Sequence, residues 1–280
     1  MTILVFGKTG QVAQELQRRD DVIALSRAEA DLMDPAVCAA IIAAADVSAV
    51  VNVAAFTDVD GAEQHAAAAN TVNGEAPAVM AAAAAKRGLP FIHISSDYVF
   101  DGSGLAPWRP NSPTAPLGAY GRSKLLGEQG IVAAGGQSVI IRTSWVFSAH
   151  GKNFVKTMLR LAADRTALNI VADQIGGPTP AADIASAIRV IASQMRAAPE
   201  LRGIFQYAGD PDVSWADFAR AIFKERGLGV TVNDIPSAAY PTPARRPLNS
   251  RLDCSSTKSV FGLDRPDWYA GLKTVLAEIG

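Results

Sequence analysis

The sequence predicts an α/β protein in which a parallel β-sheet is covered by helices on both faces. Within residues 1–140, short apolar runs alternate with segments long enough for crossover helices, as expected of repeated β-α-β units. The runs are apolar at nearly every position, which is typical of strands buried on both faces. In chain order they are ILVF (3–6), VIAL (22–25), AVVNVA (49–54), LPFIHI (89–94) and SVIIRT (138–143).

The regular alternation ends near residue 147, which divides the chain into two predicted regions. Residues 1–147 should form a doubly wound parallel sheet of the Rossmann type, and residues 148–280 a smaller α/β region that is partly interleaved with it. In the second region we expect helices and one loop. The helices are predicted over residues 153–163, 181–196 and 215–226, and the loop over residues 238–252, which are rich in Pro and Arg.

Composition excludes several classes of function. With 280 residues and 49% hydrophobic content, the chain is long enough for a full globular core. Its net charge is -1 and its Lys and Arg residues are scattered among acids, which argues against nucleic-acid binding. No apolar run reaches the ~18 residues that span a bilayer, so we expect no membrane segment.

The two cysteines, Cys38 and Cys254, lie far apart and have no metal-ligand spacing around them. This argues against a disulfide framework or a zinc site and favours reduced thiols. The N-terminal stretch MTILVFGKTG has neither the charged leader nor the long apolar core of a signal peptide. Together these features predict a cytoplasmic protein.

A glycine motif, GKTGQVA, follows the first apolar run. It places Gly7 at a tight turn and Gly10 where a backbone must approach a phosphate, followed by Gln11 and Val12 at the start of a predicted helix. Backbone N–H groups and the positive end of the helix dipole would face the pyrophosphate of a dinucleotide there. Glycines also end strands for steric reasons alone, and that interpretation stays open for the motif by itself.

The end of the second run bears on the choice of nicotinamide cofactor. In proteins that prefer NAD, an acidic residue about 20 positions past the glycines binds the ribose 2′-OH. Here Ser26 and Arg27 occupy that place. A guanidinium suits a 2′-phosphate because it forms charge-assisted hydrogen bonds to phosphate oxygens. We therefore predict NADPH over NADH, although Glu29 could still serve the ribose of NADH.

The next segment, EADLMD, allows two interpretations that coexist. Asp31 and Leu32 lie where the adenine ring of a bound cofactor would end. Asp34, which directly precedes Pro35, is a typical N-cap for the helix that follows.

A candidate proton-transfer pair lies in AYGRSK, where Tyr120 and Lys124 are four residues apart and share one face of a helix. A free tyrosine has a pKa near ~10, and a neighbouring ammonium favours the phenolate, which allows the group to pass a proton near neutral pH. In isolation, a surface tyrosine lying against a lysine stem would explain the pair equally well. The glycine motif and the hydroxyl-rich stretch ISSDYVFDG (94–102), in this order along the chain, favour the catalytic interpretation.

Ser96, Tyr120 and Lys124 resemble the Ser/Thr, Tyr, Lys triad of the extended short-chain dehydrogenases/reductases. More narrowly, the chain resembles the dTDP-4-dehydrorhamnose reductases nearly from end to end. The resemblance implies reduction of the C4 ketone of dTDP-4-dehydro-β-L-rhamnose by NADPH, or NADH, in the last step of dTDP-L-rhamnose biosynthesis. The stretches that carry it are GKTGQV, NVAAFTDVD, SSDYVFDG, PLGAYGRSKLLGE, RTSWVF, NFVKTMLRLA, DQIGGPTPA and RRPLNSRLD.

The resemblance also implies roles for single residues. Tyr120 would donate the proton, and Lys124 would lower its pKa and hold the nicotinamide ribose. Ser96 stands where the family usually has threonine and would relay a proton or bind the sugar, while Asp97 would contact the hexose. Further residues would line the ligands: Ala54, Ala55 and Phe56 the cofactor, and Trp145 the substrate.

In the second region, the resemblance implies a site for the dTDP-sugar, whose pyrophosphate requires cations. Arg246 fits the family's RPxNS pattern better than Arg245 does. Asn153 and Asn249 are candidate polar contacts, with loop and helix-cap roles equally open. The resemblance also allows a homodimer with Mg²⁺ at its contact, but no acidic ligands can be matched, so the metal stays unassigned.

The remaining polar residues near these motifs receive supporting roles. We expect Tyr98 to support Tyr120, and Ser95 and Asp101 to satisfy turn backbone. His93 lies inside a strand pattern and should be a packed core residue with a satisfied ring, not a ligand or a base. The other histidines, His65 and His150, are expected on the surface or in loops.

Two other functions stay open. A nucleotide-sugar epimerase or dehydratase shares the fold but keeps its nicotinamide tightly bound and regenerates it in every cycle. A non-catalytic relative, resembling the regulatory subunit of methionine adenosyltransferase, would act as a partner protein. The intact set of Ser96, Tyr120 and Lys124 argues against this second alternative.

Overall fold

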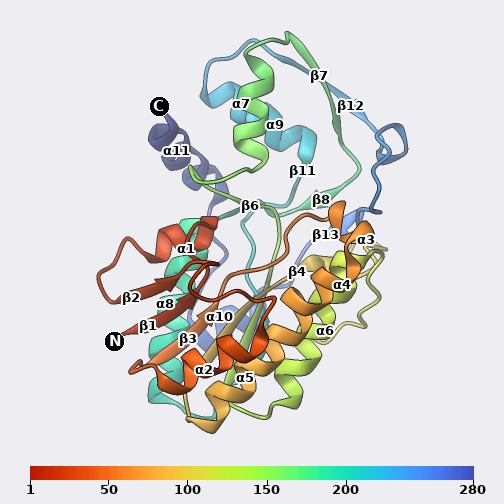
Figure 1. Cartoon of the computed structure of the whole chain (residues 1–280). Helices are drawn as coiled ribbons and strands as arrows, with labels where there is room; N and C mark the ends of the chain where they lie inside the picture. The colour runs from red at the N-terminus through yellow and green to blue at the C-terminus, as the bar shows by residue number, and fades with distance from the viewer.

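The computed structural model describes residues 1–280 and confirms the predicted α/β class. Its centre is a six-stranded sheet with the order β10-β5-β4-β3-β1-β2, in which every neighbouring pair is parallel (Figure 1). One strand lies beyond β1, where the dinucleotide-binding Rossmann order has two. The strands are β1 (Ile3–Phe6), β2 (Val22–Leu25), β3 (Ala49–Asn52), β4 (Phe91–Ser96), β5 (Ser138–Thr143) and β10 (Gly203–Gln206).

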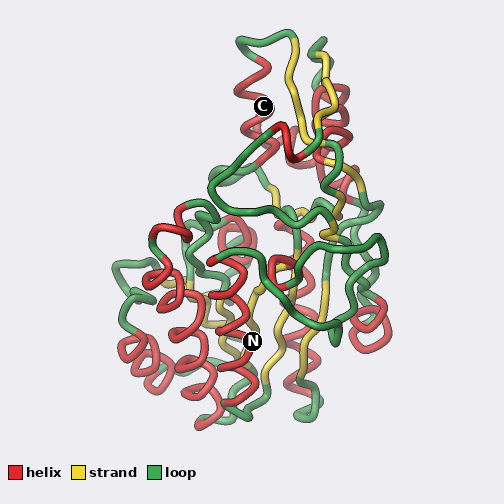
Figure 2. The backbone as a smooth tube through the Cα atoms, turned by 90° about the vertical axis from the view of Figure 1, so that its right-hand side faces the viewer, coloured by secondary structure: helices red, strands yellow, loops and turns green.

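Helices cover both faces of this sheet, as Figure 2 shows in the view along its side. Side chains of a strand alternate between the two faces, so that Ile3 and Val5 enter one core while Leu4 and Phe6 enter the other. This explains why the predicted strands are apolar at nearly every position. The first core is covered by α1 (Gln11–Leu16), α8 (Ala181–Ala197) and α10 (Ser255–Phe261), and the second by α2 (Pro35–Ala44), α5 (Ala76–Lys86) and α6 (Ala119–Ala133).

Short elements connect the long ones near the carboxyl ends of the strands. Between β3 and α5 lie α3 (Gly61–Gln64), α4 (Ala66–Asn70) and the π-helical turn η1 (Thr71–Glu75). The strand β4 runs directly into the 3-10 helix η2 (Asp97–Val99), because the Ser96 hydroxyl accepts a hydrogen bond from the Tyr98 N–H over 3.2 Å.

The second region lies beyond the carboxyl ends of the central strands and has its own core (Figure 1). The predicted helices over 153–163, 181–196 and 215–226 are present as α7, α8 and α9. A parallel strand pair, β7 with β12, packs against α9. The bounds are α7 (Phe154–Ala162), β7 (Ala167–Val171), α9 (Trp215–Glu225), β12 (Thr231–Ile235) and α11 (Trp268–Ile279).

Two-residue strands form two further small sheets, β11-β8-β13 and β6-β9, apart from the central one. The predicted loop over 238–252 is mostly irregular, but it contains β13, which pairs with β8. The remaining short elements are β6 (Val146–Phe147), β8 (Ile175–Gly176), β9 (Thr179–Pro180), β11 (Val213–Ser214), η3 (Ser237–Ala239) and β13 (Asn249–Ser250).

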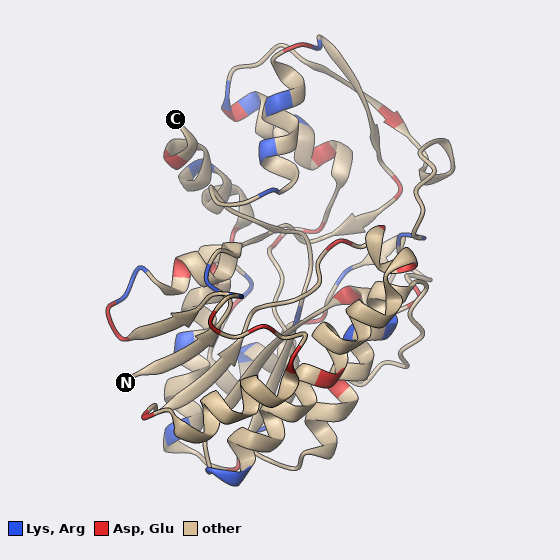
Figure 3. Ribbon diagram, in the orientation of Figure 1, with Lys and Arg blue, Asp and Glu red and all other residues tan.

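The part of the chain after residue 147 does not lie in the second region alone. Three elements that follow this residue, α8, β10 and α10, pack on the central sheet. Lys and Arg are interspersed with Asp and Glu over both regions (Figure 3). No helix combines the length and the apolar character needed to cross a membrane.

Candidate active site

The predicted catalytic residues meet at the carboxyl end of β4. Ser96 ends this strand, and Tyr120 and Lys124 lie one turn apart on α6. The rings of Tyr98 and Tyr120 are in edge-to-face contact, with centroids 5.4 Å apart. Ser96 and Lys124 are 8% and 2% exposed, so the site is held by side chains with little freedom to move.

Glycines allow α6 to approach its neighbours closely. A Cβ atom on Gly121 would lie 2.2 Å from the Tyr98 carbonyl oxygen, and one on Gly127 would lie 2.1 Å from the Asn73 carbonyl oxygen. Glycine has a low helix propensity, but a side chain at Gly121 would push α6 away from η2, and one at Gly127 would push it away from η1.

The start of α6 is capped from outside the helix. Gly118 at the N-cap has no side chain, and the Ala119 N–H donates to Glu63 Oε1 over 2.7 Å. Glu63 belongs to α3, so this bond fixes the turn of α6 that carries Tyr120 to a distant segment. No local pattern in the sequence predicts this pairing.

The pKa of Tyr120 differs from the expectation. Burial and the negative charge of Asp97 raise the pKa of Tyr120 to about 12, while the Ser96 hydroxyl offsets part of the rise. The predicted lowering by Lys124 is not seen, and the Lys124 amine is directed at the Ile94 carbonyl. Tyr120 consequently carries its proton at neutral pH.

Asp97 is a buried carboxyl group with an unusual pKa. Burial raises the pKa, to about 6, although the nearby hydroxyls of Ser250 and Ser96 offset part of the rise. Its Oδ1 accepts from the Ser96 hydroxyl over 3.0 Å. Its Oδ2 is buried and has no partner in the protein. An unpaired acceptor of this kind is suited to a ligand hydroxyl.

Lys124 lies behind Tyr120 and contacts the strands beneath it. Its Nζ donates to the Ile94 carbonyl over 2.7 Å and lies 3.2 Å from His93 Nε2. Burial lowers the pKa of Lys124 to about 8, and the charge of Glu128 partly opposes this. His93 is fully buried, as predicted, and its other ring nitrogen lies 3.1 Å from Asn52 Nδ2.

A buried ion pair anchors the other side of α6. Arg142 Nη2 lies 2.6 Å from Glu128 Oε2. The expected role of Ser95 in turn backbone is wrong, because its hydroxyl faces the helix and donates to Glu128 Oε1 over 2.6 Å. The same expectation is confirmed for Asp101, which accepts from the Ser103 N–H over 2.8 Å.

The glycine loop between β1 and α1 is shaped for a close approach. Gly7 has a φ of 110°, and a Cβ there would come within 3.3 Å of the Ala54 backbone nitrogen. The N–H groups of Lys8, Thr9 and Gly10 donate to no group of the protein. Free donors beside a glycine that leaves the surface open fit the phosphates of a dinucleotide.

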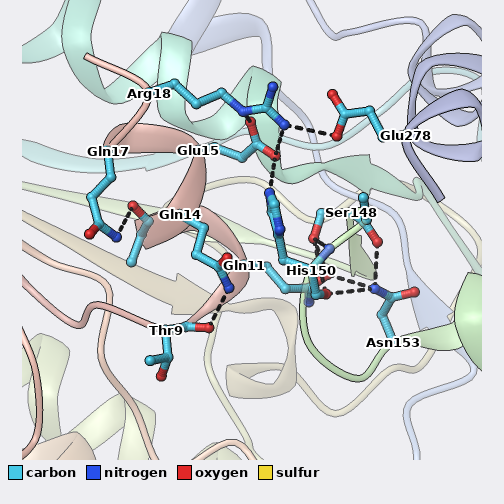
Figure 4. A network of polar contacts seen from close by, with 12 residues as sticks. Thr9, Gln11, Gln14, Glu15, Gln17, Arg18, Ser148, His150, Asn153 and Glu278 are labelled. Atoms are coloured by element: carbon cyan, nitrogen blue, oxygen red, sulfur yellow. Dashed lines mark hydrogen bonds and ion pairs between the residues drawn. The ribbon is translucent and has the colours of Figure 1, made fainter. Parts of the chain in front are cut away.

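Two glutamines brace this loop from α1 (Figure 4). Gln14 Nε2 donates to the Thr9 carbonyl over 2.8 Å, and Gln17 Nε2 donates to the Lys8 carbonyl over 2.7 Å. The carbonyl groups are thereby satisfied within the protein, while the N–H groups of the loop are left free.

Asn73 positions the segment that follows β3 and was missed by sequence reasoning. It accepts from the Phe56 N–H over 2.8 Å, and its amide donates to the Phe56 carbonyl and to Ser123 of α6 over 3.0 and 2.9 Å. Of the predicted cofactor-lining residues Ala54, Ala55 and Phe56, the last is thus linked through Asn73 to α6.

The residues after β2 pair with one another. Ser26 donates to Glu29 over 2.6 Å, and Arg27 Nε lies 3.2 Å from Asp31 Oδ2. The Arg27 side chain is 77% exposed and can reorient toward a ligand. In contrast, Leu32 lies in the core beneath this loop. The alternative role of Asp34 is confirmed, since its side chain accepts from the Val37 N–H at the start of α2.

Gln11 joins the glycine loop to the second region (Figure 4). Its Oε1 accepts from the Ser148 hydroxyl over 2.9 Å and from Asn153 Nδ2 over 3.0 Å. The Asn153 Oδ1 also caps α7 by accepting from the Lys156 N–H. For Asn153 the helix-cap interpretation is therefore the one that the structure shows.

Trp145 turns the chain out of the sheet after β5. It is the one non-glycine residue with positive φ, 51°, a conformation that is unfavourable for a bulky side chain. Its ring stacks on Trp215 with centroids 3.6 Å apart. A strained residue held by stacking between the two regions is typical of a ligand-binding position.

The polar side chains of the RRPLNS stretch, which is predicted to bind the substrate, have different surroundings. Arg246 Nη2 lies 2.9 Å from Asp60 Oδ2, and Arg246 Nη1 is buried without a partner. Arg245 is exposed. The side-chain amide of Asn249 donates to the Ser103 and Ala106 carbonyl groups within the loop. For Asn249 the loop role is therefore the one that the structure shows.

The residues present do not fit a magnesium site. Glu15, His150 and Glu278 place their ligand atoms within 4.8 Å of one another. The guanidinium of Arg18 already pairs with both glutamates, at 2.6 and 2.8 Å (Figure 4). His150, in a loop as predicted, lies 3.1 Å from Glu15 through Nε2. A cation of the protein itself thus takes up the negative charge of this cluster.

A doubly wound parallel sheet, with a glycine loop after β1 and a tyrosine and lysine of α6 beside the end of β4, defines an α/β protein of the Rossmann type. The match to the family described as the RmlD substrate binding domain extends over residues 1–280, and the chain belongs to this family.

Two relatives are similar to this chain in sequence over nearly the whole length. The dTDP-4-dehydrorhamnose reductase of Sinorhizobium fredii is 45% identical, with 96% of this chain and 94% of the relative covered. That of Burkholderia thailandensis is also 45% identical, with 96% and 95% covered.

Two crystal structures of dTDP-4-dehydrorhamnose reductases are closely similar in fold. The one from Clostridium acetobutylicum has a TM-score of 0.93 and 31% identity, covering 100% of this chain and 99% of its own. The one from Bacillus anthracis, in complex with NADP, has a TM-score of 0.91 and 29% identity, covering 99% and 100%.

Proposed function

We propose that the protein reduces the C4 ketone of dTDP-4-dehydro-β-L-rhamnose with NADPH and forms dTDP-β-L-rhamnose, the last step of dTDP-L-rhamnose biosynthesis. The observation that carries this proposal is the Tyr120 hydroxyl, which keeps its proton at neutral pH beside Ser96 at the buried end of β4. The names of the relatives support the substrate, and the NADP complex of the Bacillus anthracis structure supports the cofactor.

Bound NADPH would supply the hydride to the carbonyl carbon of the sugar. As negative charge develops on the carbonyl oxygen, Tyr120 would transfer its phenolic proton to that oxygen, and the Ser96 hydroxyl would turn its proton from Asp97 Oδ1 to the same oxygen. Asp97 Oδ2, which has no partner within the protein, would accept from a sugar hydroxyl. Lys124 would hold the nicotinamide ribose.

The phosphate groups of both ligands have candidate partners. The free N–H groups of the glycine loop would bind the dinucleotide pyrophosphate, and Arg27 would leave Asp31 to bind the 2′-phosphate. Arg246 offers its buried, unpaired Nη1 to the substrate pyrophosphate. The reaction would take place in the cytoplasm, which agrees with two free, buried cysteines. The homodimer stays a prediction that the molar mass in solution can test.

The test is NADPH oxidation by the purified protein, with dTDP-4-dehydro-L-rhamnose generated from dTDP-glucose by a dehydratase and an epimerase. We expect turnover that needs the epimerised ketosugar and is faster with NADPH than with NADH. A folded protein that binds NADPH but does not oxidise it would contradict the proposal. Purification with stoichiometric NAD would instead indicate an epimerase or dehydratase.

A further inference from the structure

The short helix α3 is fixed to the helix that carries Tyr120. Ala62 of α3 and Ala119 of α6 belong to one small apolar cluster, against which Phe56 and Tyr120 pack. The Ala119 N–H also donates to Glu63 Oε1. A group held by α3 is therefore held in a defined position relative to Tyr120.

Asp60 joins α3 to the second region of the chain. It stands at the N-cap of α3, where an aspartate usually accepts from the first turn, yet its side chain makes no such bond. Its Oδ1 instead accepts from the Ala244 N–H over 3.0 Å, and its Oδ2 lies 2.9 Å from Arg246 Nη2. One carboxylate thus fixes both the backbone and a guanidinium of the same distant segment.

The segment that carries Arg246 is also anchored at its other end. The Asn249 N–H donates to the Gly102 carbonyl over 3.0 Å, and a Cβ on Gly102 would lie 2.5 Å from Pro247 Cα. Arg246 lies between this contact and the Ala244 contact with Asp60. Its backbone is held on both sides, so the direction of its side chain is set mainly by Asp60 Oδ2.

The second terminal nitrogen of the same guanidinium is not used by the protein. Arg246 Nη1 is buried and has no partner. Burial raises the pKa of Tyr98, and the positive charge of Arg246 opposes this rise, so the guanidinium lies close to Tyr98. The Tyr98 ring in turn contacts Tyr120. A buried, charged N–H donor beside these tyrosines is suited to an anionic group of a ligand.

We propose that Asp60 is a positioning residue for substrate binding, which holds Arg246 Nη2 so that Nη1 is directed at the pyrophosphate of a nucleoside diphosphate sugar. The inference deepens the proposed function and rests on it for the class of substrate. The carboxylate opposes an incoming anion, but it is 37% exposed and already paired, so water and the guanidinium screen this repulsion. Loss of the guanidinium orientation outweighs it.

Asp60→Asn removes the ion pair with little other change. The asparagine carbonyl can still accept from the Ala244 N–H, but its amide presents N–H donors to Arg246 in place of an acceptor. The matched control is Asp58→Asn in the same turn. Asp58 is exposed and its carboxylate accepts from the Gly61 N–H over 2.9 Å.

The measurement compares the dissociation constants of dTDP and thymidine in the presence of saturating NADP⁺, by calorimetry for dTDP and by NMR titration for thymidine. Asp60→Asn should weaken dTDP binding by about tenfold, as expected when a hydrogen bond to a charged group is lost. Thymidine has no phosphate, so its affinity should stay the same. Asp58→Asn should change neither constant. In turnover, Asp60→Asn should raise KM for the sugar nucleotide more than it lowers kcat.

A double-mutant cycle shows whether Asp60 acts through Arg246. Arg246→Met should weaken dTDP binding, and adding Asp60→Asn to this variant should have no further effect. A further loss in the double variant, an equal loss for thymidine, or tighter dTDP binding in Asp60→Asn would overturn the role of Asp60. A wild-type protein that does not bind dTDP would overturn it as well.

The binding measurements do not require turnover, which separates this inference from the proposed reaction. If Asp60→Asn weakens dTDP binding as expected but the reductase assay fails, only the proposed reaction is rejected. If the reductase assay succeeds and Asp60→Asn binds dTDP as the wild type does, only the role of Asp60 is rejected.

Discussion

Glu128 of α6 and Arg142 of β5 form an ion pair in which both side chains are only 2% exposed. A second bond joins Arg142 Nε to Glu128 Oε1 over 2.9 Å, and Ser95 donates to the same oxygen. The pair fastens the helix that carries Tyr120 and Lys124 to the central sheet. If one partner is removed, the other remains as a buried charge without compensation.

Glu128→Gln should therefore lower the free energy of unfolding by about 3–5 kcal/mol, measured by urea denaturation. The matched control is Asp234→Asn, which breaks the exposed pair of Arg220 and Asp234, whose side chains are 43% and 55% exposed. Asp234→Asn should lower the free energy of unfolding by less than about 1 kcal/mol. If both variants lose the same unfolding free energy, the buried pair of Glu128 and Arg142 contributes no more to stability than a surface pair.

Tyr120→Phe should reduce kcat by about 10²–10⁴-fold, because the ring stays in place but the proton donor is lost. Binding of NADPH, followed by fluorescence titration, should be nearly unchanged. Tyr207→Phe is the control, since Tyr207 is a buried tyrosine in the core away from the proposed site. Turnover at the wild-type rate in Tyr120→Phe would show that another group donates the proton.

Asp97→Asn should change how stability depends on pH. Because burial raises the pKa of Asp97 to about 6, the folded protein binds this proton more tightly than the unfolded chain, whose aspartate has a pKa of about 3.9. The stability that Asp97 contributes is highest below about pH 4 and declines as pH rises to about 6. The unfolding free energy of the wild type minus that of Asp97→Asn should therefore fall across this window.

For Asp101→Asn, the stability difference from the wild type should change with pH in the opposite direction. The Ser103 N–H lowers the pKa of Asp101, so the stability that this residue contributes is lost as pH falls. The wild-type-minus-variant difference should thus rise with pH for Asp101 while it falls for Asp97. If the two differences change with pH in the same direction, the burial of the Asp97 carboxyl group does not raise its pKa as described.

Gly121→Ala should destabilise the protein by about 1–3 kcal/mol and impair turnover, because the new Cβ meets the Tyr98 carbonyl oxygen at 2.2 Å and shifts α6. Gly229→Ala is the control, since a Cβ there meets nothing within 4 Å and the backbone is not left-handed. Thermal unfolding of both variants tests the difference. If Gly121→Ala is as stable as Gly229→Ala, α6 does not pack as closely as the structure shows.

The strands and the placement of Tyr120 and Lys124 on one helix face could be predicted because their signals are local. A strand buried on both faces is apolar throughout, and Tyr120 and Lys124 share a helix face at fixed spacing. Asn73 and Glu63 could not be found in this way. Each acts on a backbone group far along the chain, and an isolated Asn or Glu gives no indication of which distant N–H group it will meet.

The direction of the Lys124 amine and the pairing of Ser95 could not be predicted for the same reason. Spacing along α6 shows that Lys124 lies one turn from Tyr120, but not which way its amine points. That direction depends on carbonyl and imidazole groups of β4, which only the packed structure brings under the helix. The hydroxyl of Ser95 is likewise claimed by a carboxylate of α6.

The pairing of β10 with β5 limits how the protein can be divided. A fragment ending at residue 147 would lose β10 together with α8 and α10, and the backbone N–H and C=O groups of β5 would have no partner on one side. The exposed strand contains Val139, Ile140 and Ile141, an apolar edge of the kind that templates aggregation. The sheet formed by residues 1–147 thus acquires a protected edge only after the chain has passed through the second region, and the two parts of the chain must fold as one unit.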